Sequence, residues 1–263
     1  MADHLSPELH ELTYSYRDYE AEVTFVELCW QEYTECDNNR VLDMGCGIGE
    51  HTRQFILRGY ECDGFDCDPE MIEFARKKLE AEGIKADIWH DNMHKFEVDR
   101  KYGLAINMLA SANFILTNEE MITHLSSVAR SLDTGGILLL EMFHPREYGF
   151  PKDNPLNNWE IYGDDFYLEC ILHFNQEPLD TISQTQRTTK KVTITRNETT
   201  EEILLDRKQR VYLYQEFRAL VESAGGFEMV NCYGAFNPER TIDNTKRSWR
   251  MIPVLRRTEG EIK

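Results

Sequence analysis

The sequence predicts an α/β fold in which a doubly wound, mostly parallel sheet of seven strands carries an antiparallel β insertion after its fifth strand. Three observations predict this fold. From Val41 to Met142, short apolar runs alternate with segments of helical periodicity, which is the order of parallel strands and crossover helices. A glycine-rich turn from Gly45 to Gly49 joins the first strand to the first helix. After Phe166, β-type runs follow one another with short turns between them, as in antiparallel hairpins.

The composition is that of a globular protein with an acidic surface. Of the 263 residues, 41% are hydrophobic, and 47 acidic against 29 basic side chains give a net charge of −18. This charge repels a polyanion, so we expect no nucleic-acid partner. No apolar run reaches the length of a membrane span, and the N-terminus has no secretory signal. We therefore expect no membrane partner and a cytoplasmic location.

The cysteines and histidines do not predict a metal site. The seven cysteines are odd in number and contain no C-x-x-C pair, which is typical of a reducing compartment without a disulfide framework or zinc cluster. His90, Asp91 and His94 resemble an H-E-x-x-H motif, but that chemistry needs both histidines on one helical face with a glutamate between them. Here the predicted context is a strand end and the acidic residue is an aspartate. We expect no bound metal.

The pattern divides the chain into a cap, a core and an insertion. Apolar residues recur at helical spacing near the start, so residues 1–35 are predicted to form an N-terminal helical cap. The core comprises residues 36–147 and 213–263. Residues 148–212 form the antiparallel insertion, and residues 149–165 within it have no periodicity and are predicted to be a loop.

The predicted elements follow in chain order. Core strands are expected at residues 41–43, 60–65, 85–89, 102–109, 137–142, 227–236 and 248–256, and core helices at residues 50–57, 68–82, 118–132 and 215–224. Gly135 and Gly136 are expected to turn the chain before the fifth strand. In the insertion, turn-like breaks are expected at residues 176–178, 188–190 and 197–199.

The turn after the first strand indicates which nucleoside binds. A dinucleotide fingerprint, G-x-G-x-x-G, needs a third glycine where this chain has Glu50. A carboxylate at that helix N-terminus opposes a pyrophosphate, which disfavours a dinucleotide oxidoreductase. The sequence instead offers D-x-G-x-G-x-G, from Asp43 to Gly49. This motif resembles the glycine-rich motif of class I S-adenosylmethionine-dependent methyltransferases, whose cofactor has no phosphate.

The resemblance implies a Rossmann-like fold, S-adenosyl-L-methionine as cofactor and S-adenosyl-L-homocysteine as product. It implies that the glycine motif lies beside the methionine portion of the cofactor, with these residues in contact: Asp43, Gly45, Cys46, Gly47 and Gly49. Asp91 matches the family's carboxylate that accepts a hydrogen bond from the adenine amine, and Asn92 and Met93 line the ring. Tyr14 and Tyr19 resemble tyrosines that close over the cofactor, although packing of an amphipathic helix explains them equally well.

The second strand is predicted to end at the ribose. Asp66 lies at the distance from the glycine turn where an acidic residue accepts both ribose hydroxyls. Asp68 is the competing carboxylate, but it precedes Pro69 and is expected to cap the following helix. Cys67 and Met71 are expected against the adenine, and burial in the core is an equal alternative for Met71.

Methyl transfer asks mainly for alignment, because a sulfonium is an activated donor. We expect in-line displacement to a small-molecule acceptor at an amine nitrogen, which needs only to arrive unprotonated, whereas a hydroxyl benefits from a general base. His144, just after the fifth strand, is the candidate base or substrate contact, with a loop histidine without a role as the alternative. Leu109 is expected at the cofactor, and Ser111 and Asn113 at the acceptor.

The insertion resembles the antiparallel strands that cover the active site in small-molecule methyltransferases, so residues 148–212 are expected to form a lid over the substrate. The overall order is most similar to sugar-amine and glycine-type N-methyltransferases. Alternatives stay open: an O-methyltransferase of a small molecule, a protein or nucleic-acid methyltransferase, or a non-catalytic S-adenosylmethionine-binding regulatory module. The acceptor and the oligomeric state are not determined by the sequence, and a homodimer is one arrangement that we consider.

Overall fold

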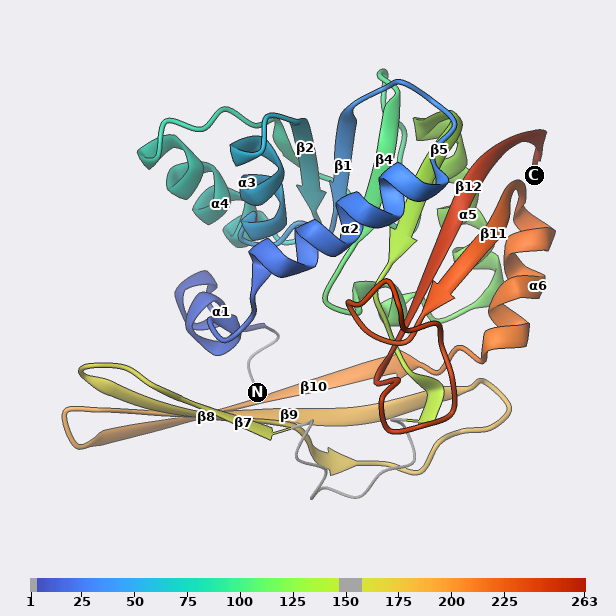
Figure 1. Ribbon diagram of the computed structural model, residues 1–263. Coiled ribbons are helices and arrows are strands. Elements are labelled where there is room, and N and C mark those ends of the chain that lie inside the picture. Colours follow the sequence, from blue (N-terminus) through green and yellow to red (C-terminus); the bar gives the residue numbers. More distant parts are fainter. Residues whose placement is uncertain (1–3, 147–157) are drawn as a thin grey trace. The chain divides into compact units, whose positions relative to one another are not determined.

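The structure, a computed structural model, describes residues 4–146 and 158–263. The chain divides into two compact units (Figure 1). Residues 18–145 and 212–263 form the core unit, and residues 1–17 and 146–211 form the antiparallel unit. None of the helices in the described ranges combines the length and the apolar character that a membrane crossing requires.

The core unit is built on one mixed sheet. Its strands are β1 (Arg40–Met44), β2 (Glu61–Asp66), β3 (Ile88–His90), β4 (Tyr102–Asn107), β5 (Leu132–Leu140), β6 (Met142–Phe143), β11 (Gly225–Tyr233) and β12 (Arg250–Ile262). They lie in the order β11-β12-β5-β4-β1-β2-β3, and the short β6 pairs with β12. The pairs among β1 to β5 are parallel, and β12 is antiparallel to both β5 and β11. The predicted doubly wound, mostly parallel sheet is confirmed, with β6 as an addition.

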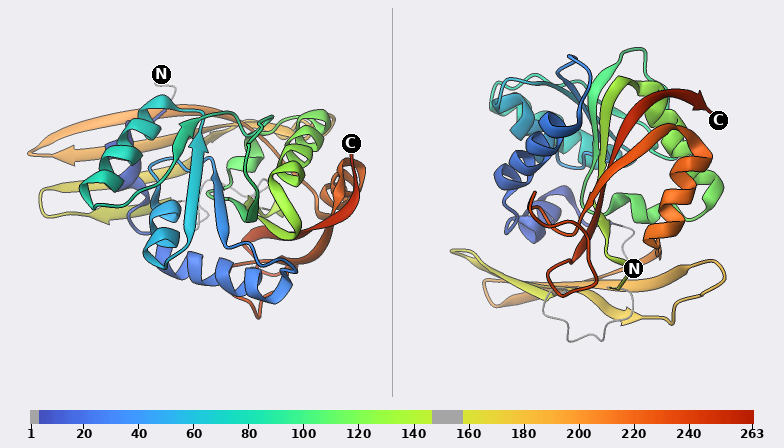
Figure 2. Two further views of the ribbon diagram at one scale, coloured as in Figure 1. Left: turned by 90° about the horizontal axis from the view of Figure 1, so that it is seen from above. Right: turned by 45° about the vertical axis from the view of Figure 1, so that its right-hand side comes forward.

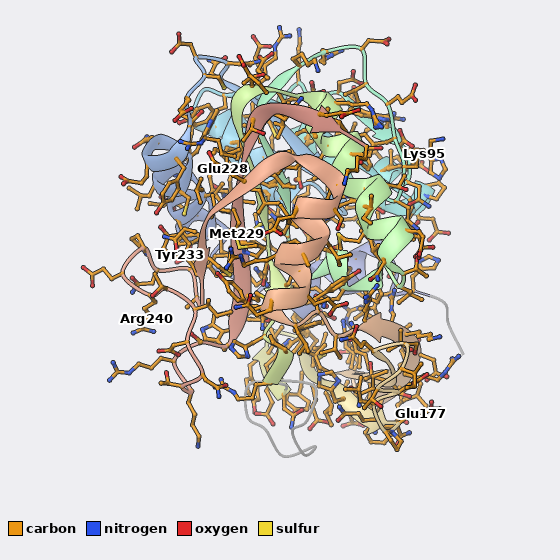
Figure 3. The ribbon with its side chains drawn as sticks, turned by 90° about the vertical axis from the view of Figure 1, so that its right-hand side faces the viewer. Lys95, Glu177, Glu228, Met229, Tyr233 and Arg240 are labelled. Atoms are coloured by element: carbon orange, nitrogen blue, oxygen red, sulfur yellow. The ribbon has the colours of Figure 1, made fainter. Side chains whose placement is uncertain are left out.

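Helices cover both faces of this sheet. They are α2 (Tyr19–Tyr33), α3 (Glu50–Leu57), α4 (Pro69–Ala81), α5 (Asn118–Ser131) and α6 (Tyr214–Ala224). Successive residues of a strand belong to different layers, since Val41 packs with residues of α2 and α3 while Leu42 packs with residues of α5 and α6. Figures 1 and 2 show α2 on one face and α5 and α6 on the other. Figure 3 shows α6 in front, with Met229 and Tyr233 marking the course of β11.

Local signals determine where the core helices begin and end. The Thr117 hydroxyl accepts from the backbone N–H of Glu120 at 3.1 Å, and the Glu120 carboxylate accepts from the N–H of Thr117 at 3.1 Å, a capping box for α5. Gly59 follows the end of α3 with a φ of +91°, as predicted for a residue that ends a helix.

The antiparallel unit is a four-stranded sheet with one helix. Its elements are α1 (Pro7–Tyr14), β7 (Asn158–Tyr162), β8 (Phe166–Gln176), β9 (Thr185–Arg196) and β10 (Thr199–Arg210), and the strand order is β10-β9-β8-β7. Leu9 and Leu12 of α1 pack on an apolar cluster of this sheet that includes Val192 and Leu205. The Trp159 indole donates to the carbonyl of Thr13 at 2.7 Å, which ties β7 to the helix.

The predicted helical cap over residues 1–35 is divided between the two units. α1 ends at Tyr14, and α2 begins after Asp18, whose carboxylate accepts from the N–H of Ala21 at 2.9 Å. The apolar residues of α1 pack in the antiparallel unit, whereas α2 buries Val23 and its neighbours in the core unit. Helical periodicity reveals an apolar face but not the sheet that the face will cover.

The insertion differs from the sequence prediction at two places. The expected break at residues 188–190 is wrong, because these residues lie inside β9 and pair with β10 on one side. Thr188 and Thr189 also pair with β8 on the other side, so their polar side chains occupy a central strand. The expected loop over residues 149–165 contains β7, while residues 149–157 lie outside the described residues.

The two glycines before the fifth strand do not form a turn. Gly135 and Gly136 lie inside β5, where the register against β4 shifts. A Cβ on Gly135 would lie 2.7 Å from the carbonyl carbon of Glu35, whose N–H donates to the Gly135 carbonyl at 2.9 Å. These glycines therefore allow a close approach between backbone segments.

Candidate active site

The predicted site residues of the core unit follow strands that end at one edge of the sheet. β1 is flanked by β2 and β4, and the chain passes from β1 to β2 on one side and later to β4 and β5 on the other. The strand order therefore reverses between β1 and β4. In open α/β sheets, ligands bind outside the carboxyl ends of the strands at such a reversal. This edge is the candidate active site.

The glycine turn after β1 is tied to β2 by its backbone. The N–H groups of Gly45 and Cys46 both donate to the carbonyl of Phe65, at 2.8 and 3.0 Å. Gly47 and Gly49 have φ values of +53° and +79°, which favour glycine. A Cβ on Gly49 would lie 3.3 Å from Ala75 of α4, whereas a Cβ on Gly47 would meet nothing within 4 Å. Gly49 thus serves helix packing, and Gly47 leaves space for a ligand.

Asp66 is held in place by two backbone N–H groups. One carboxylate oxygen accepts from Gly47 at 2.8 Å and the other from Asp68 at 2.9 Å. Burial raises the pKa of Asp66, and these hydrogen bonds partly offset the increase. Each oxygen can accept a second hydrogen bond. The Asp68 side chain accepts from the N–H of Glu70 at 2.9 Å, so its predicted role as helix cap is confirmed.

Asp43 is almost fully buried beneath the turn. It is 1% exposed and accepts from the hydroxyl of Thr52 at 2.8 Å, so it links β1 to α3. Burial raises the pKa of Asp43. At the start of the same helix, Glu50 forms an ion pair with Lys78 of α4. The glycine turn is therefore bordered by carboxylates.

The loop after β3 is held from both ends. The N–H of Asp91 donates to the carbonyl of Asp66 at 3.1 Å, and the Asp91 carboxylate accepts from the N–H of Asn92 at 2.8 Å. Nδ1 of His124 in α5 lies 2.7 Å from the carbonyl oxygen of Met93, so the ring donates from Nδ1. Burial lowers the pKa of His124 to about 4, which keeps the ring neutral at pH 7.

His90 and His94 do not have the helical geometry that an H-E-x-x-H zinc motif requires. β3 ends at His90, and the chain up to His94 is not helical. The ring of His90 lies 3.2 Å from the carbonyl oxygen of Cys67. Within residues 4–146 and 158–263, no three histidine, cysteine or carboxylate side chains gather as metal ligands.

The loop after β4 adopts an unusual backbone conformation. Leu109 and Ala110 both have a φ of +58°, a region that side chains disfavour. Glu141, which is fully buried, accepts from the N–H of Leu109 at 2.7 Å and from Nε of Arg250 at 2.8 Å. The carboxylate therefore fixes the loop backbone and is neutralised by a neighbouring guanidinium.

The side chains expected at the acceptor follow this loop in a short 3₁₀ helix, Ser111–Phe114. The hydroxyl of Ser111 donates to the carbonyl of Met108 at 3.0 Å. The side-chain oxygen of Asn113 accepts from the N–H of Phe143 at 3.1 Å, which connects the loop to β6. Ser111 and Asn113 therefore both stabilise the conformation of this loop through their side-chain hydrogen bonds.

Asn107, at the end of β4, is a site residue that the sequence analysis missed. It is fully buried and donates from Nδ2 to the carbonyl of Met44 at 2.6 Å, across the point where the strand order reverses. Its side-chain oxygen is buried without a hydrogen-bond partner among the described residues. A Cβ on Gly45 would lie 3.4 Å from Nδ2. A polar residue ending an otherwise apolar strand is the signal that could have found it.

The remaining candidates take different positions. His144 is 5% exposed, and its Nε2 lies 3.0 Å from the carbonyl oxygen of Asp243, to which it donates. The Tyr19 ring packs edge-on against His51 in the core unit, with 5.0 Å between ring centroids. Tyr14 belongs to the antiparallel unit. In α4, Met71 is buried, which is also what packing in the core requires.

This edge fits a nucleoside cofactor that carries positive charge and no phosphate. Gly47 leaves space beside the backbone, Asp66 presents fixed acceptors, and the oxygen of Asn107 lacks a hydrogen-bond donor among the described residues. Hydroxyl and ammonium groups are the donors that such acceptors bind. Carboxylates around the turn suit a cation better than a pyrophosphate.

Comparison with known proteins agrees with this geometry. Residues 41–136 match the family model described as "Methyltransferase domain". A dTDP-3-amino-3,4,6-trideoxy-alpha-D-glucopyranose N,N-dimethyltransferase from Streptomyces venezuelae is 27% identical over 125 residues, which are 48% of this chain and 51% of that protein. The chain thus spans about half the length of the curated relatives that it matches.

Two solved structures share the fold over nearly the whole chain. An S-adenosylmethionine-dependent methyltransferase from Clostridium acetobutylicum has a TM-score of 0.77 and 16% identity, covering 94% of this chain and 95% of its own. The S-adenosylmethionine-bound amino pentose methyltransferase CalS10 from Micromonospora echinaspora has a TM-score of 0.76 and 18% identity, covering 98% and 100%. Residues 41–136 therefore match a methyltransferase domain, and the chain shares its fold with these two solved methyltransferases.

Proposed function

We propose that the protein transfers a methyl group from S-adenosylmethionine to the amine nitrogen of a small-molecule acceptor. The observation that carries this proposal is the glycine turn, in which the open Gly47 donates its N–H to Asp66 at 2.8 Å. The turn lies where the strand order reverses and belongs to the segment that matches the methyltransferase domain. Amine acceptors in the names of the dimethyltransferase relative and of the amino pentose methyltransferase support nitrogen as the methylated atom.

Residues at the carboxyl ends of β1 to β4, in the loops that follow them and in α4 are proposed to hold the cofactor. Asp66 accepts hydrogen bonds from the ribose hydroxyls with the lone pairs that Gly47 and Asp68 leave. Asp91 accepts from the adenine amine, and Met93 packs on the ring. The rest of the proposed contacts are Asp43, Gly45, Cys46, Gly49, Cys67, Met71, Asn92 and Leu109. When bound, the cofactor supplies a methyl group activated by its sulfonium.

The chain's own contribution to catalysis is to orient the acceptor and exclude water. The loop from Leu109 to Asn113 is rigid, because Glu141 and Phe143 hold it, so groups that it presents keep a fixed position. An amine needs to reach this loop in its unprotonated form. The surrounding carboxylates attract an amine in its cationic, protonated form and stabilise that form. The amine must therefore lose its proton before the methyl group is transferred.

His144 is proposed to contact the acceptor. Its Nε2–H donates to the carbonyl of Asp243, so the neutral ring carries its basic nitrogen at Nδ1. For an amine acceptor this nitrogen accepts a hydrogen bond and orients the nucleophile. For a hydroxyl acceptor it would act as general base. Residues 148–212 are proposed to form the lid that excludes water.

Label transfer from S-adenosylmethionine tests the function. Amino-sugar nucleotides and their hydroxyl analogues are incubated separately with protein and a cofactor that carries a labelled methyl group. We expect label in the amines. Label only in the hydroxyl analogues would replace the proposal with O-methylation. Binding of S-adenosylhomocysteine without transfer to any acceptor would favour a non-catalytic module.

A further inference from the structure

Lys190 in β9 is a buried cation that has no carboxylate partner among the described residues. The residue is 7% exposed. Among the described residues, its ammonium donates to the hydroxyl of Tyr14 at 3.1 Å and lies 4.5 Å from the centroid of the same ring. Both contacts are with a neutral side chain. Removing an ammonium from water without a negative partner costs free energy, so such groups are normally paired.

The adjacent lysine shows the ordinary arrangement. Lys191 points to the opposite face of the sheet, because successive strand residues alternate. Its ammonium lies 2.5 Å from the carboxylate of Glu202. The carboxylate of Asp206 belongs to that same face, where it accepts from the hydroxyl of Thr189 at 2.6 Å. The carboxylates of Glu202 and Asp206 therefore lie on the face away from Lys190.

The face of Lys190 carries a second cation. Arg207 in β10 lies opposite Thr188, and Lys190 lies opposite Leu205, so the two basic residues share one face two positions apart. His10 of α1 is near both, because Lys190 and Arg207 contribute, after burial, to lowering its pKa to about 3. Lys190 is buried on this face, and Arg207 is half-buried.

The groups around Lys190 are also able to donate hydrogen bonds. The Tyr14 hydroxyl accepts from Lys190 and retains its own proton for another acceptor. The neutral ring of His10 stacks near Tyr14, with 4.7 Å between ring centroids. Its Nδ1 is buried without a hydrogen-bond partner among the described residues. An unsatisfied buried nitrogen beside an unpaired ammonium is typical of a site whose ligand supplies the missing partners.

We propose that Lys190, Tyr14 and His10, with Arg207, form an anion-binding site in the antiparallel unit that takes a phosphate group. Phosphate suits this set, because lysine acts as a point charge and arginine as a planar donor toward its several oxygens. The site's role is to bind a phosphate-bearing acceptor, a role that rests on the proposed function. Anion binding itself does not depend on the cofactor or on methyl transfer.

Inorganic pyrophosphate is the probe, titrated calorimetrically into the full chain at constant ionic strength. We compare the wild type with Lys190→Met, which keeps the length of the side chain without its charge, and with Lys191→Met as the matched control. We expect the dissociation constant to rise at least tenfold in Lys190→Met and less than twofold in Lys191→Met. Tyr14→Phe, which keeps the ring, should weaken binding severalfold.

Several results would overturn the proposal. They are no pyrophosphate binding to the wild type, equal losses in both lysine variants, or binding of malonate as tight as that of pyrophosphate, which would indicate a carboxylate site. S-adenosylhomocysteine affinity should be unchanged in Lys190→Met, which shows that the variant is folded. Pyrophosphate binding without methyl transfer would support the anion site and reject the proposed function. Methyl transfer without pyrophosphate binding would support the proposed function and reject the anion site.

Discussion

Two loops at the same sheet edge reach left-handed backbone conformations by different means. In the turn after β1, the left-handed positions are glycines, and the turn is fastened by backbone hydrogen bonds to Phe65. In the loop after β4, the left-handed positions are Leu109 and Ala110, and the fastening comes from the side chain of Glu141. The conformation of the first loop is determined by residue types within the loop itself. The second depends on a carboxylate 32 positions away.

Backbone strain persists in a loop where another interaction compensates for it. A non-glycine residue in the left-handed region costs roughly 1–2 kcal/mol, so the loop after β4 needs a compensating interaction. The charge-assisted hydrogen bond from Leu109 to Glu141 supplies one, and the ion pair with Arg250 keeps the buried carboxylate neutralised. The loop after β3 resembles this second loop, because His124 holds the carbonyl of Met93.

The largest expected effect comes from breaking the second loop. Glu141→Gln removes the negative partner of Arg250, whose side chain is only 15% exposed. We expect the free energy of unfolding to fall by about 3 kcal/mol, because a buried cation loses its counter-charge. Denaturant unfolding measures the change. Glu61→Gln is the control, because its partner Arg40 is well exposed and the loss should stay below about 1 kcal/mol. Equal losses would contradict the assigned role of Glu141.

The loop after β3 is expected to respond to pH. The folded pKa of His124, about 4, lies below the value of 6.5 in the unfolded chain. Between pH 6.5 and 4 the unfolded state binds the additional proton, so stability is lost as the pH falls through this window. His124→Asn keeps a donor for Met93 without the titrating ring. Between pH 7 and pH 4, the free energy of unfolding should fall less in this variant than in the wild type, by about 3 kcal/mol. Parallel pH curves for the two proteins would contradict this prediction.

A smaller effect is expected at Asp66, which accepts a hydrogen bond from the glycine turn. Asp66→Ala should weaken S-adenosylhomocysteine binding by about 1–3 kcal/mol, because two charge-assisted hydrogen bonds are lost. Asp68→Ala should leave the affinity unchanged and lower stability by about 1 kcal/mol through loss of the helix cap. Titration calorimetry and unfolding measured on both variants separate the two roles. Reversed affinities would assign the ribose to Asp68.

The smallest effects are expected when a glycine of the first loop is replaced by alanine and an alanine of the second loop by glycine. Gly47→Ala should lower stability by about 1 kcal/mol, since an alanine is disfavoured at a φ of +53°. Ala110→Gly should leave stability unchanged or raise it by about 0.5 kcal/mol, because relief of strain offsets the added chain entropy. Thermal unfolding of the paired variants measures both. A loss in Ala110→Gly as large as that in Gly47→Ala would show that the loop after β4 is not strained.

Features determined by local residue types could be predicted from the sequence, whereas features that depend on distant contacts could not. The βαβ unit was predictable, because its turn, the cap at Asp68 and the end of α3 at Gly59 are recorded in local residue types. The strand through Thr188 was not, because pairing on both sides of β9 outweighs the low apolar content of this segment. His124 and Glu141 were missed for a related reason. They act on loops far along the chain, and nothing in their neighbourhood marks the contact.

The most direct measurement is calorimetric titration of the protein with S-adenosylmethionine and S-adenosylhomocysteine, with NADH as the control. We expect saturable binding of both sulfur compounds and none of NADH, because the glycine turn is open at Gly47 and bordered by carboxylates. Tighter binding of NADH, or binding of none of the three, would contradict the assignment of this sheet edge as the cofactor site.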